Sequence, residues 1–160
     1  GAATILLAVW LLDPRRRRGR LMWGVVAGSF CGGLVTDLIK LSVDRVRPRA
    51  LDFEAVQATL ATFATPQGLG GSDLHSFPSG HSAVAAGLAC TLAVLYPRGR
   101  WLFAGVAAMA CFQRIVASAH YPSDVLTGAA IGVAVATVCA RATQIPAAAD
   151  ADARPSCDTL

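Results

Sequence analysis

Four long apolar blocks limit what this chain can fold into more than any other feature of its sequence. Each block has about the length that a helix needs to cross a bilayer, roughly 20 mostly apolar residues. Small residues recur in all four, as expected where membrane helices pack closely. The blocks comprise residues 21–43, 78–96, 101–119 and 123–140. The sequence therefore predicts an all-α fold, a polytopic transmembrane helix bundle with four complete spans.

The two ends of the 160-residue chain differ from these blocks. Residues 1–12 are apolar but too short for a crossing, and the positive charge follows them, unlike in a signal peptide. We expect them to be the remnant of a longer helix in an N-terminally truncated chain. Residues 142–160 are rich in Ala and Asp, which predicts a disordered tail. The expected organisation is one membrane domain, residues 1–141, followed by a cytoplasmic tail.

Arginines between the blocks predict how the chain faces the membrane. Arginines gather within residues 15–20, two lie in the short turn at 98–100, and Arg141 follows the last block. If the spans alternate, these groups share one side, which the positive-inside rule makes cytoplasmic. The run at 15–18 is alternatively a nucleic-acid site, but its position beside a span favours topology, and we expect no nucleic-acid partner.

The opposite, outer side carries cations that run against this rule: Lys40, Arg45, Arg47, Arg49 and Arg114. Charges in or beside spans are costly and usually functional, so we expect these cations to gather around an anion. The outer segment 51–63 has an amphipathic helical pattern that either lies along the membrane surface or packs on the bundle. Residues 65–76 have the Gly and Pro content of a flexible loop.

The first of three polar clusters on this outer side lies at the end of the first block. Lys40 and Arg47 are seven positions apart, which is two helical turns and predicts one shared helix face. Pro48 then ends or kinks that helix. Alternatively, both cations snorkel to the interface or pair with Asp37 and Asp44, and this cluster alone favours that alternative.

The second cluster opens the second block. Pro78 suits a first helical turn, with Ser76 or Ser79 as its cap. Gly80 lets the backbone approach a ligand, and the free N–H groups of a helix start bind anions. His81 adds a titratable group. From this cluster alone, a phosphate site and a capped helix with an incidental histidine are equally well supported.

The third cluster joins the last two blocks. Arg114 lies inside an apolar block, six residues before His120. Pro122 breaks the helix and begins the next, so Asp124 is expected near His120 across a tight corner. A carboxylate beside an imidazole fixes its tautomer and prepares a nucleophile or base. The alternative is a helix N-terminal acid with an interfacial histidine.

All three clusters fall on the predicted outer face, and together they favour one chemistry. The transition state of phosphoryl transfer is stabilised mainly by positioned positive charge, which lysine, arginine and backbone N–H groups supply. His120 and Asp124 would be only two metal ligands, too few for a site. The sequence therefore predicts phosphoryl transfer without a metal or other cofactor.

The clusters also form a three-part motif, K-x6-RP, PSGH and R-x5-H-x3-D, that resembles the signature of the type 2 phosphatidic acid phosphatase superfamily, especially its bacterial members. It spans residues 40–124, with Gln113 where the family usually has Ser. Membrane members usually have six helices, with the motifs on the last four. The resemblance therefore implies that the four blocks are the last four of six helices.

The resemblance also implies a role for each matching residue. His120 would attack phosphorus and form a phosphohistidine, with Asp124 orienting it. His81 would protonate the leaving oxygen and later activate water. The residues that would hold the phosphate are Lys40, Arg47, Ser79, Gly80 and Arg114.

The expected protein is thus a lipid phosphatase of the bacterial inner membrane, with its site facing outward. Phosphatidic acid, phosphatidylglycerol phosphate and polyprenyl diphosphate are candidate substrates. A lipid phosphotransferase with the same site and a non-catalytic binder of anionic lipids are the alternatives.

Overall fold

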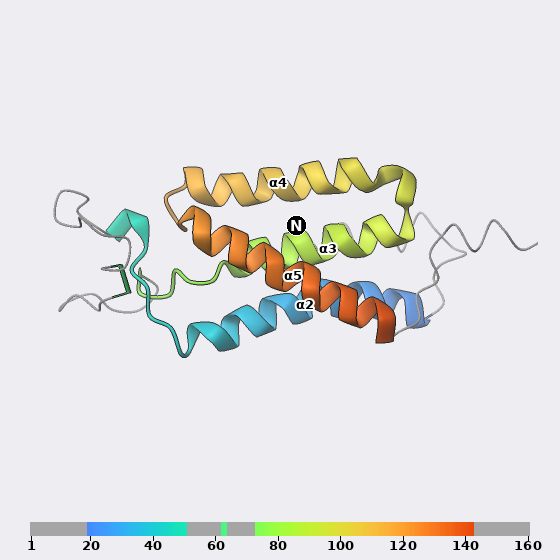
Figure 1. Cartoon of the computed structure of the whole chain (residues 1–160), viewed down its shortest axis with the longest axis horizontal. Helices are drawn as coiled ribbons and strands as arrows, with labels where there is room; N and C mark the ends of the chain where they lie inside the picture. The colour runs from blue at the N-terminus through green and yellow to red at the C-terminus, as the bar shows by residue number, and fades with distance from the viewer. Residues whose placement is uncertain (1–18, 51–61, 64–72, 143–160) are drawn as a thin grey trace, which may run out of the picture.

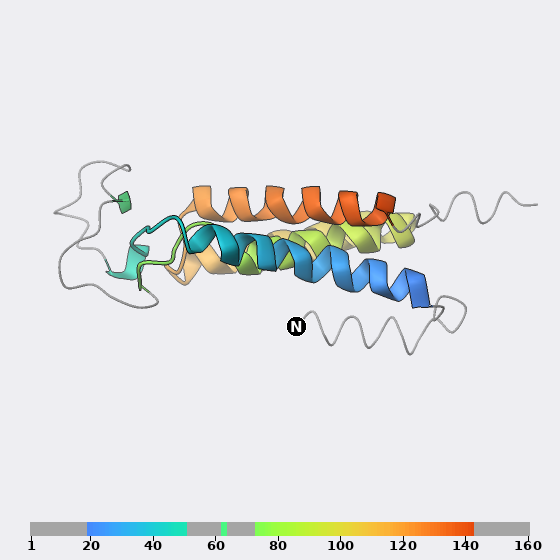
Figure 2. The same ribbon diagram turned by 90° about the horizontal axis from the view of Figure 1, so that it is seen from below.

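Four helices run lengthwise beside one another in the computed structural model of this chain, which describes residues 19–50, 62–63 and 73–142 (Figures 1 and 2). They are α2 (Gly19–Lys40), α3 (Gly80–Leu95), α4 (Arg100–Val116) and α5 (Pro122–Ala142), with short 3-10 turns η2 (Pro48–Ala50) and η5 (Pro97–Gly99). A helix lies at each predicted block, which confirms the all-α expectation for the described ranges. Residues 1–12, most of the segment 51–63, residues 65–72 of the loop and the tail beyond Ala142 lie outside those ranges.

Helix α3 is the centre of the bundle, since it contacts α2, α4 and α5 (Figure 1). The α5 backbone approaches α3 closely at two glycines. A Cβ atom on Gly128 would lie 2.2 Å from Ser79 O, and one on Gly132 would lie 2.1 Å from Ala83 O. Only glycine permits this contact, which sets the start of α5 directly against the start of α3.

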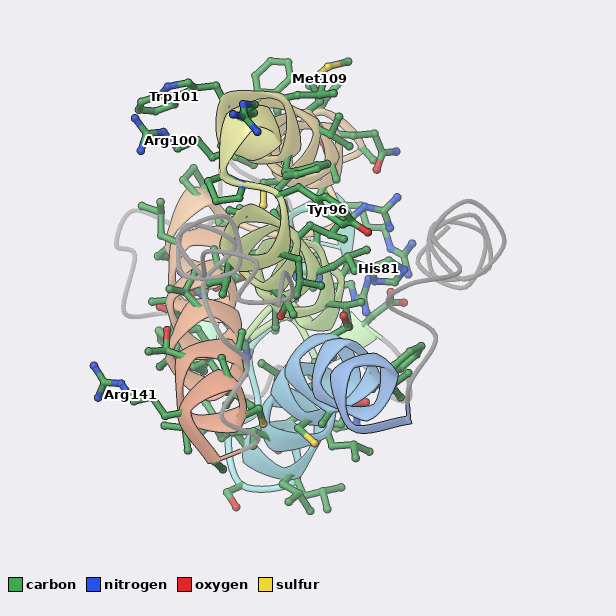
Figure 3. The ribbon with its side chains drawn as sticks, turned by 90° about the vertical axis from the view of Figure 1, so that its right-hand side faces the viewer. His81, Tyr96, Arg100, Trp101, Met109 and Arg141 are labelled. Atoms are coloured by element: carbon green, nitrogen blue, oxygen red, sulfur yellow. The ribbon has the colours of Figure 1, made fainter. Side chains whose placement is uncertain are left out.

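Apolar side chains both fill the bundle and cover its outside. Leu88, Leu92 and Leu95 of α3 form a buried cluster. Exposed apolar side chains are frequent on α4, where Trp101 and Met109 point away from the other helices (Figure 3). Among the helices in the described ranges, only α5 is both long and apolar enough to cross a membrane. The bundle of four complete spans therefore stays a prediction.

One helix end differs from the prediction. Helix α2 ends at Lys40, so Arg47 does not share a helix face with it, and that prediction was wrong. The reason is that the chain around Arg47 makes other backbone hydrogen bonds. Arg47 N donates to Asp73 O (2.8 Å), and Ser76 N donates to Arg45 O (3.0 Å). These bonds tie the first cluster to the segment that precedes α3.

Two prolines also lie outside the helices to which the sequence assigned them. Pro48 begins η2 and does not end α2, because α2 has already ended. Pro78 precedes Ser79, the N-cap of α3, and is not part of the first turn. Pro122 begins α5, as predicted.

Candidate active site

The three sequence clusters meet at one end of the bundle, on the left in Figure 1. Helices α2 and α4 end there, and α3 and α5 begin there. The opposite end holds the η5 turn between α3 and α4. This arrangement follows from the antiparallel order of the helices, which returns each cluster to the same end.

Ser79 caps α3 and links the second cluster to the third. Its backbone is extended (φ −79°, ψ 107°), and its hydroxyl oxygen accepts hydrogen bonds from Ser82 N (3.4 Å) and Ser82 Oγ (2.9 Å). The Ser79 side chain is fully buried, so its hydroxyl serves the helix start. Ser79 N donates to Asp124 O (3.0 Å). The starts of α3 and α5 are therefore joined by a direct hydrogen bond.

Lys40 lies against the start of α3. A Cβ atom on Gly80 would be 3.4 Å from Lys40 Nζ and 3.5 Å from Asp37 Oδ1. Lys40 Nζ also donates to Asp37 Oδ1 (3.0 Å), so the pairing with Asp37 that the sequence left open is present. The absence of a side chain at Gly80 thus brings the ammonium group close to the N-terminal backbone of α3, where an anion binds favourably.

His120 is held by a backbone carbonyl. Its side chain is 4% exposed, and its Nδ1 lies 2.7 Å from Ser76 O but 3.9 Å from Asp124 Oδ2. Because a carbonyl oxygen only accepts, Nδ1 carries the hydrogen and Nε2 of the neutral ring keeps its lone pair. A left-handed residue, Ser118 (φ 49°), lies in the turn that leads from α4 to His120.

The surroundings of His120 favour the neutral imidazole. Burial lowers its pKa below the ordinary value, and the cations Arg47 and Lys40 act in the same direction. The hydrogen bond to Ser76 and the charge of Asp124 oppose this shift. At neutral pH the ring is therefore uncharged, as a nucleophile requires.

His81 and Arg114 both interact electrostatically with Arg47, and within the part of the chain that the structure describes neither forms a hydrogen bond or ion pair with His120. His81 is exposed on the side of the bundle between α2 and α4 (Figure 3). Its ring interacts electrostatically with three cations, Arg114, Lys40 and Arg47, and with the opposite charge of Asp37. The Arg114 guanidinium donates from Nε to Gln113 Oε1 (2.6 Å). Gln113, which replaces the usual Ser, therefore holds Arg114 in this structure.

Sequence reasoning missed one residue of this site, Arg45. It is 2% exposed, and its guanidinium forms an ion pair with Asp124, which is 0% exposed. The sequence signal was present, because Arg45 is one of the outer cations that oppose the positive-inside rule. The anion that Arg45 faces is a carboxylate of the chain itself.

A groove of about 810 Å³ leads away from this end between α2, α3 and α4. Lys40, Asp37 and His81 line its polar end. Its remaining lining is mainly apolar and includes Val84, Leu88 and Leu92 of α3 and Val106 of α4. The groove thus joins a polar end of the bundle to a long apolar surface.

Comparisons with known proteins agree with this geometry. The family model of the PAP2 superfamily matches residues 21–146. The chain is 36% identical over 128 residues to a lipid A 1-phosphatase of Rhizobium johnstonii, covering 76% of this chain and 50% of the relative. It is 37% identical over 127 residues to a decaprenylphosphoryl-5-phosphoribose phosphatase of Mycobacterium tuberculosis, covering 78% of this chain and 62% of the relative.

The chain thus spans about half to three fifths of the length of these relatives. No solved structure matches it. The family match covers most of the chain and contains all three motifs, which the fold brings to one end of the bundle. The chain therefore belongs to the PAP2 superfamily.

Proposed function

We propose that this protein is a membrane phosphatase that hydrolyses a lipid phosphate or diphosphate without a metal ion, through a phosphohistidine intermediate. The main support for this proposal is the groove between α2, α3 and α4. Its polar end, where Lys40 and His81 lie, suits a phosphate group, and its apolar length suits the hydrocarbon chain of a lipid. Both named relatives act on lipid-linked phosphates according to their names, which supports the same substrate class.

The first chemical step is an attack by His120 on phosphorus. Nε2 forms the N–P bond while the bond to the leaving oxygen breaks, and His81 gives that oxygen its proton. Charge that develops on the phosphoryl oxygens is stabilised by Lys40, Arg47 and Arg114. The start of α3 at Gly80 contributes its dipole and backbone N–H groups, and Ser79, whose N–H donates to Asp124 O, holds that helix start in place.

The second step regenerates the enzyme. Water attacks phosphorus, His81 takes its proton, and the P–N bond breaks so that His120 returns to the neutral form. Asp124 stabilises the positive charge that His120 carries as phosphohistidine, at 3.9 Å from its Nδ1. Within the described ranges, no three His, Cys, Asp or Glu side chains converge as a metal site would require.

We further propose that residues 1–141 form a domain of the bacterial inner membrane with this site on the outer side. Residues 142–160 would then form the cytoplasmic tail. The exposed arginines at the opposite end, Arg98, Arg100 and Arg141, support this orientation.

The deciding experiment measures phosphate release by the whole protein in detergent, across a panel of lipid monophosphates and diphosphates. We expect release from at least one lipid, retained activity in EDTA, inhibition by vanadate and complete loss in His120→Asn. Loss of activity in EDTA would contradict the metal-independent mechanism. Binding of the lipids without phosphate release would instead support the non-catalytic binder. Transfer of the phosphoryl group to an added acceptor lipid in place of water would support the phosphotransferase.

A further inference from the structure

The Arg45 side chain is almost completely buried, with polar and aromatic partners around its guanidinium. Nε donates to Thr62 Oγ1 (3.0 Å), and Nη1 donates to Ser123 Oγ (2.8 Å) and to Asp124 Oδ1. The guanidinium carbon lies 4.6 Å from the ring centre of Phe63 and 4.2 Å from that of Tyr121. Such cation–π contacts strengthen when they are shielded from water.

This enclosure separates Arg45 from the arginines proposed to bind phosphate. At 2% exposure its guanidinium has no room for a phosphate group beside its carboxylate partner. Arg47, two residues later, is only partly buried and interacts electrostatically with both histidines of the site. Arg45 therefore serves the protein's own carboxylate and not the substrate.

Asp124 is the group through which Arg45 can reach the chemistry. One carboxylate oxygen accepts from Arg45, and the other accepts from Ser76 Oγ (2.6 Å) and Tyr121 N (3.0 Å). A buried carboxylate with these partners is fixed in both position and charge. Removal of the arginine alone would leave an uncompensated buried charge.

Ser76 completes the path to His120. Its hydroxyl donates to Asp124, and its carbonyl accepts the Nδ1 hydrogen of His120 at 2.7 Å. Its N–H in turn donates to Arg45 O (3.0 Å), so the Arg45 backbone and side chain both act on the same small unit. The tautomer and direction of His120 therefore depend on Ser76, and Ser76 is held by Arg45 and Asp124.

We propose that Arg45 is a positioning residue, which acts through Asp124 and Ser76 to hold Nε2 of His120 toward the substrate phosphorus. This inference rests on the proposed phosphatase function and deepens it. It predicts that loss of Arg45 lowers turnover and leaves binding of the phosphate group largely unchanged. A displacement of about 1 Å of a reacting group can cost about 100-fold in rate.

The test is a double-mutant cycle on the whole protein in detergent micelles, with dioctanoyl phosphatidic acid as the probe or, failing that, the best lipid of the panel. We expect Arg45→Gln to lower kcat about 100-fold, with KM changed less than about threefold. Arg45→Gln combined with Asp124→Asn should be no slower than the slower single variant, because both break one unit.

Two comparison variants separate positioning from general damage. Arg49→Gln removes a neighbouring exposed guanidinium that pairs with Asp73, and it should keep kcat within about twofold. Arg47→Gln should instead raise KM, and its effect should multiply with that of Arg45→Gln. If Arg45→Gln does not fold, Arg45→Lys replaces it in the test. Thr62→Val, which removes one hydrogen-bond acceptor of Arg45, should lower kcat with KM unchanged.

The outcomes are distinct. Independent, multiplying effects of Arg45→Gln and Asp124→Asn, or a raised KM with normal kcat, would overturn the positioning role. If Arg45→Gln folds, an Arg45→Lys variant that is no faster than Arg45→Gln would also overturn this role. If Arg45→Gln does not fold, a Thr62→Val variant with wild-type kcat would overturn it. A wild-type protein that releases phosphate from no lipid would overturn the proposed function together with this inference, whereas an active wild type with an additive cycle would overturn the inference alone.

Discussion

In the proposed mechanism, the hydrogen bond between His120 and Ser76 determines which ring nitrogen attacks phosphorus. The 2.7 Å contact between Nδ1 and the carbonyl leaves Nε2 unprotonated in the neutral ring. Asp124, at 3.9 Å, acts on the same ring through its charge and through Ser76. The residue that fixes the tautomer is thus a serine whose carbonyl carries no sequence signal.

We predict that His120 titrates below about 6.5, the ordinary value for histidine. Burial lowers its pKa because the charged ring loses hydration, and the cations Arg47 and Lys40 repel the added proton. The neutral imidazole therefore persists as the pH falls through 6.5. Nitrogen-15 NMR of histidine-labelled protein in detergent would measure the midpoint, with the signal assigned by its absence in His120→Asn.

Arg47→Gln should raise that midpoint, because it removes one repelling charge. Arg49→Gln serves as the matched control and should leave it in place. A wild-type midpoint above 6.5, or a neutral ring protonated at Nε2, would contradict the geometry described for His120.

The sequence predicts the residues proposed for the chemistry but not those that support them. Spacing and residue type single out His81, His120 and Asp124, because imidazole and carboxylate groups are those used for nucleophilic and acid–base catalysis. Arg45 was counted among the outer cations, but nothing local to it predicts a partner in α5. Its role depends on the backbone bonds between the segment after α2 and the segment before α3, which join residues far apart in sequence.

Among the helices, the contact between α3 and α5 controls the site most directly. Asp124 begins one helix and Ser79 caps the other, so any separation of the two backbones moves both motifs. The glycines of α5 permit this approach, and a Cβ atom on Gly28 of α2 would likewise lie 2.6 Å from Thr91 Oγ1 of α3. Small residues thus set the geometry of the helices that carry the chemistry.

We therefore predict that Gly132→Ala destabilises the protein by about 1–3 kcal/mol, since its Cβ would lie 2.1 Å from Ala83 O and the backbones must move apart. Gly105→Ala is the matched control, because a Cβ there meets nothing within 4 Å. That change should stabilise α4 by about 0.5–1 kcal/mol through helix propensity. Thermal unfolding in detergent measures both; equal effects of the two variants would contradict the tight packing.

The groove along α3 gives a second prediction for these helices. Ala89 lines the groove, so Ala89→Phe should obstruct a long hydrocarbon chain and lower kcat/KM for long-chain lipid phosphates about tenfold. Turnover of a short-chain lipid should change little. Ala104→Phe places the same side chain on the exposed surface of α4 and should spare both substrates. Equal loss for short and long chains in Ala89→Phe would argue against chain binding there.

Element positions were predictable because apolar blocks and prolines mark them, as Pro122 at the start of α5 illustrates. The end of α2 could not be predicted in this way. Lys40 and Arg47 have helical spacing, yet the chain leaves the helix at Lys40 because backbone bonds to residues 73–76 are available. Those partners lie far along the chain, and local periodicity contains no information about them.

Among the residues whose side chains the structure describes, several cations fall into two classes by what they face. At the site end, Lys40, Arg45 and Arg49 each pair with a carboxylate of the chain, namely Asp37, Asp124 and Asp73. Arg98, Arg100 and Arg141 at the opposite end are exposed.

This division leads to the prediction that the site end faces outward in a bacterial cell. Ser42 is exposed in the turn after α2 at the site end, and Arg98 is exposed in η5 at the opposite end. In a background without the five native cysteines, a membrane-impermeant maleimide should label Ser42→Cys in intact cells. Arg98→Cys should react only after permeabilisation, which also proves that its thiol is reactive. Labelling of Arg98→Cys but not of Ser42→Cys in intact cells would reverse the orientation, and the substrate would then have to be a lipid phosphate of the inner leaflet.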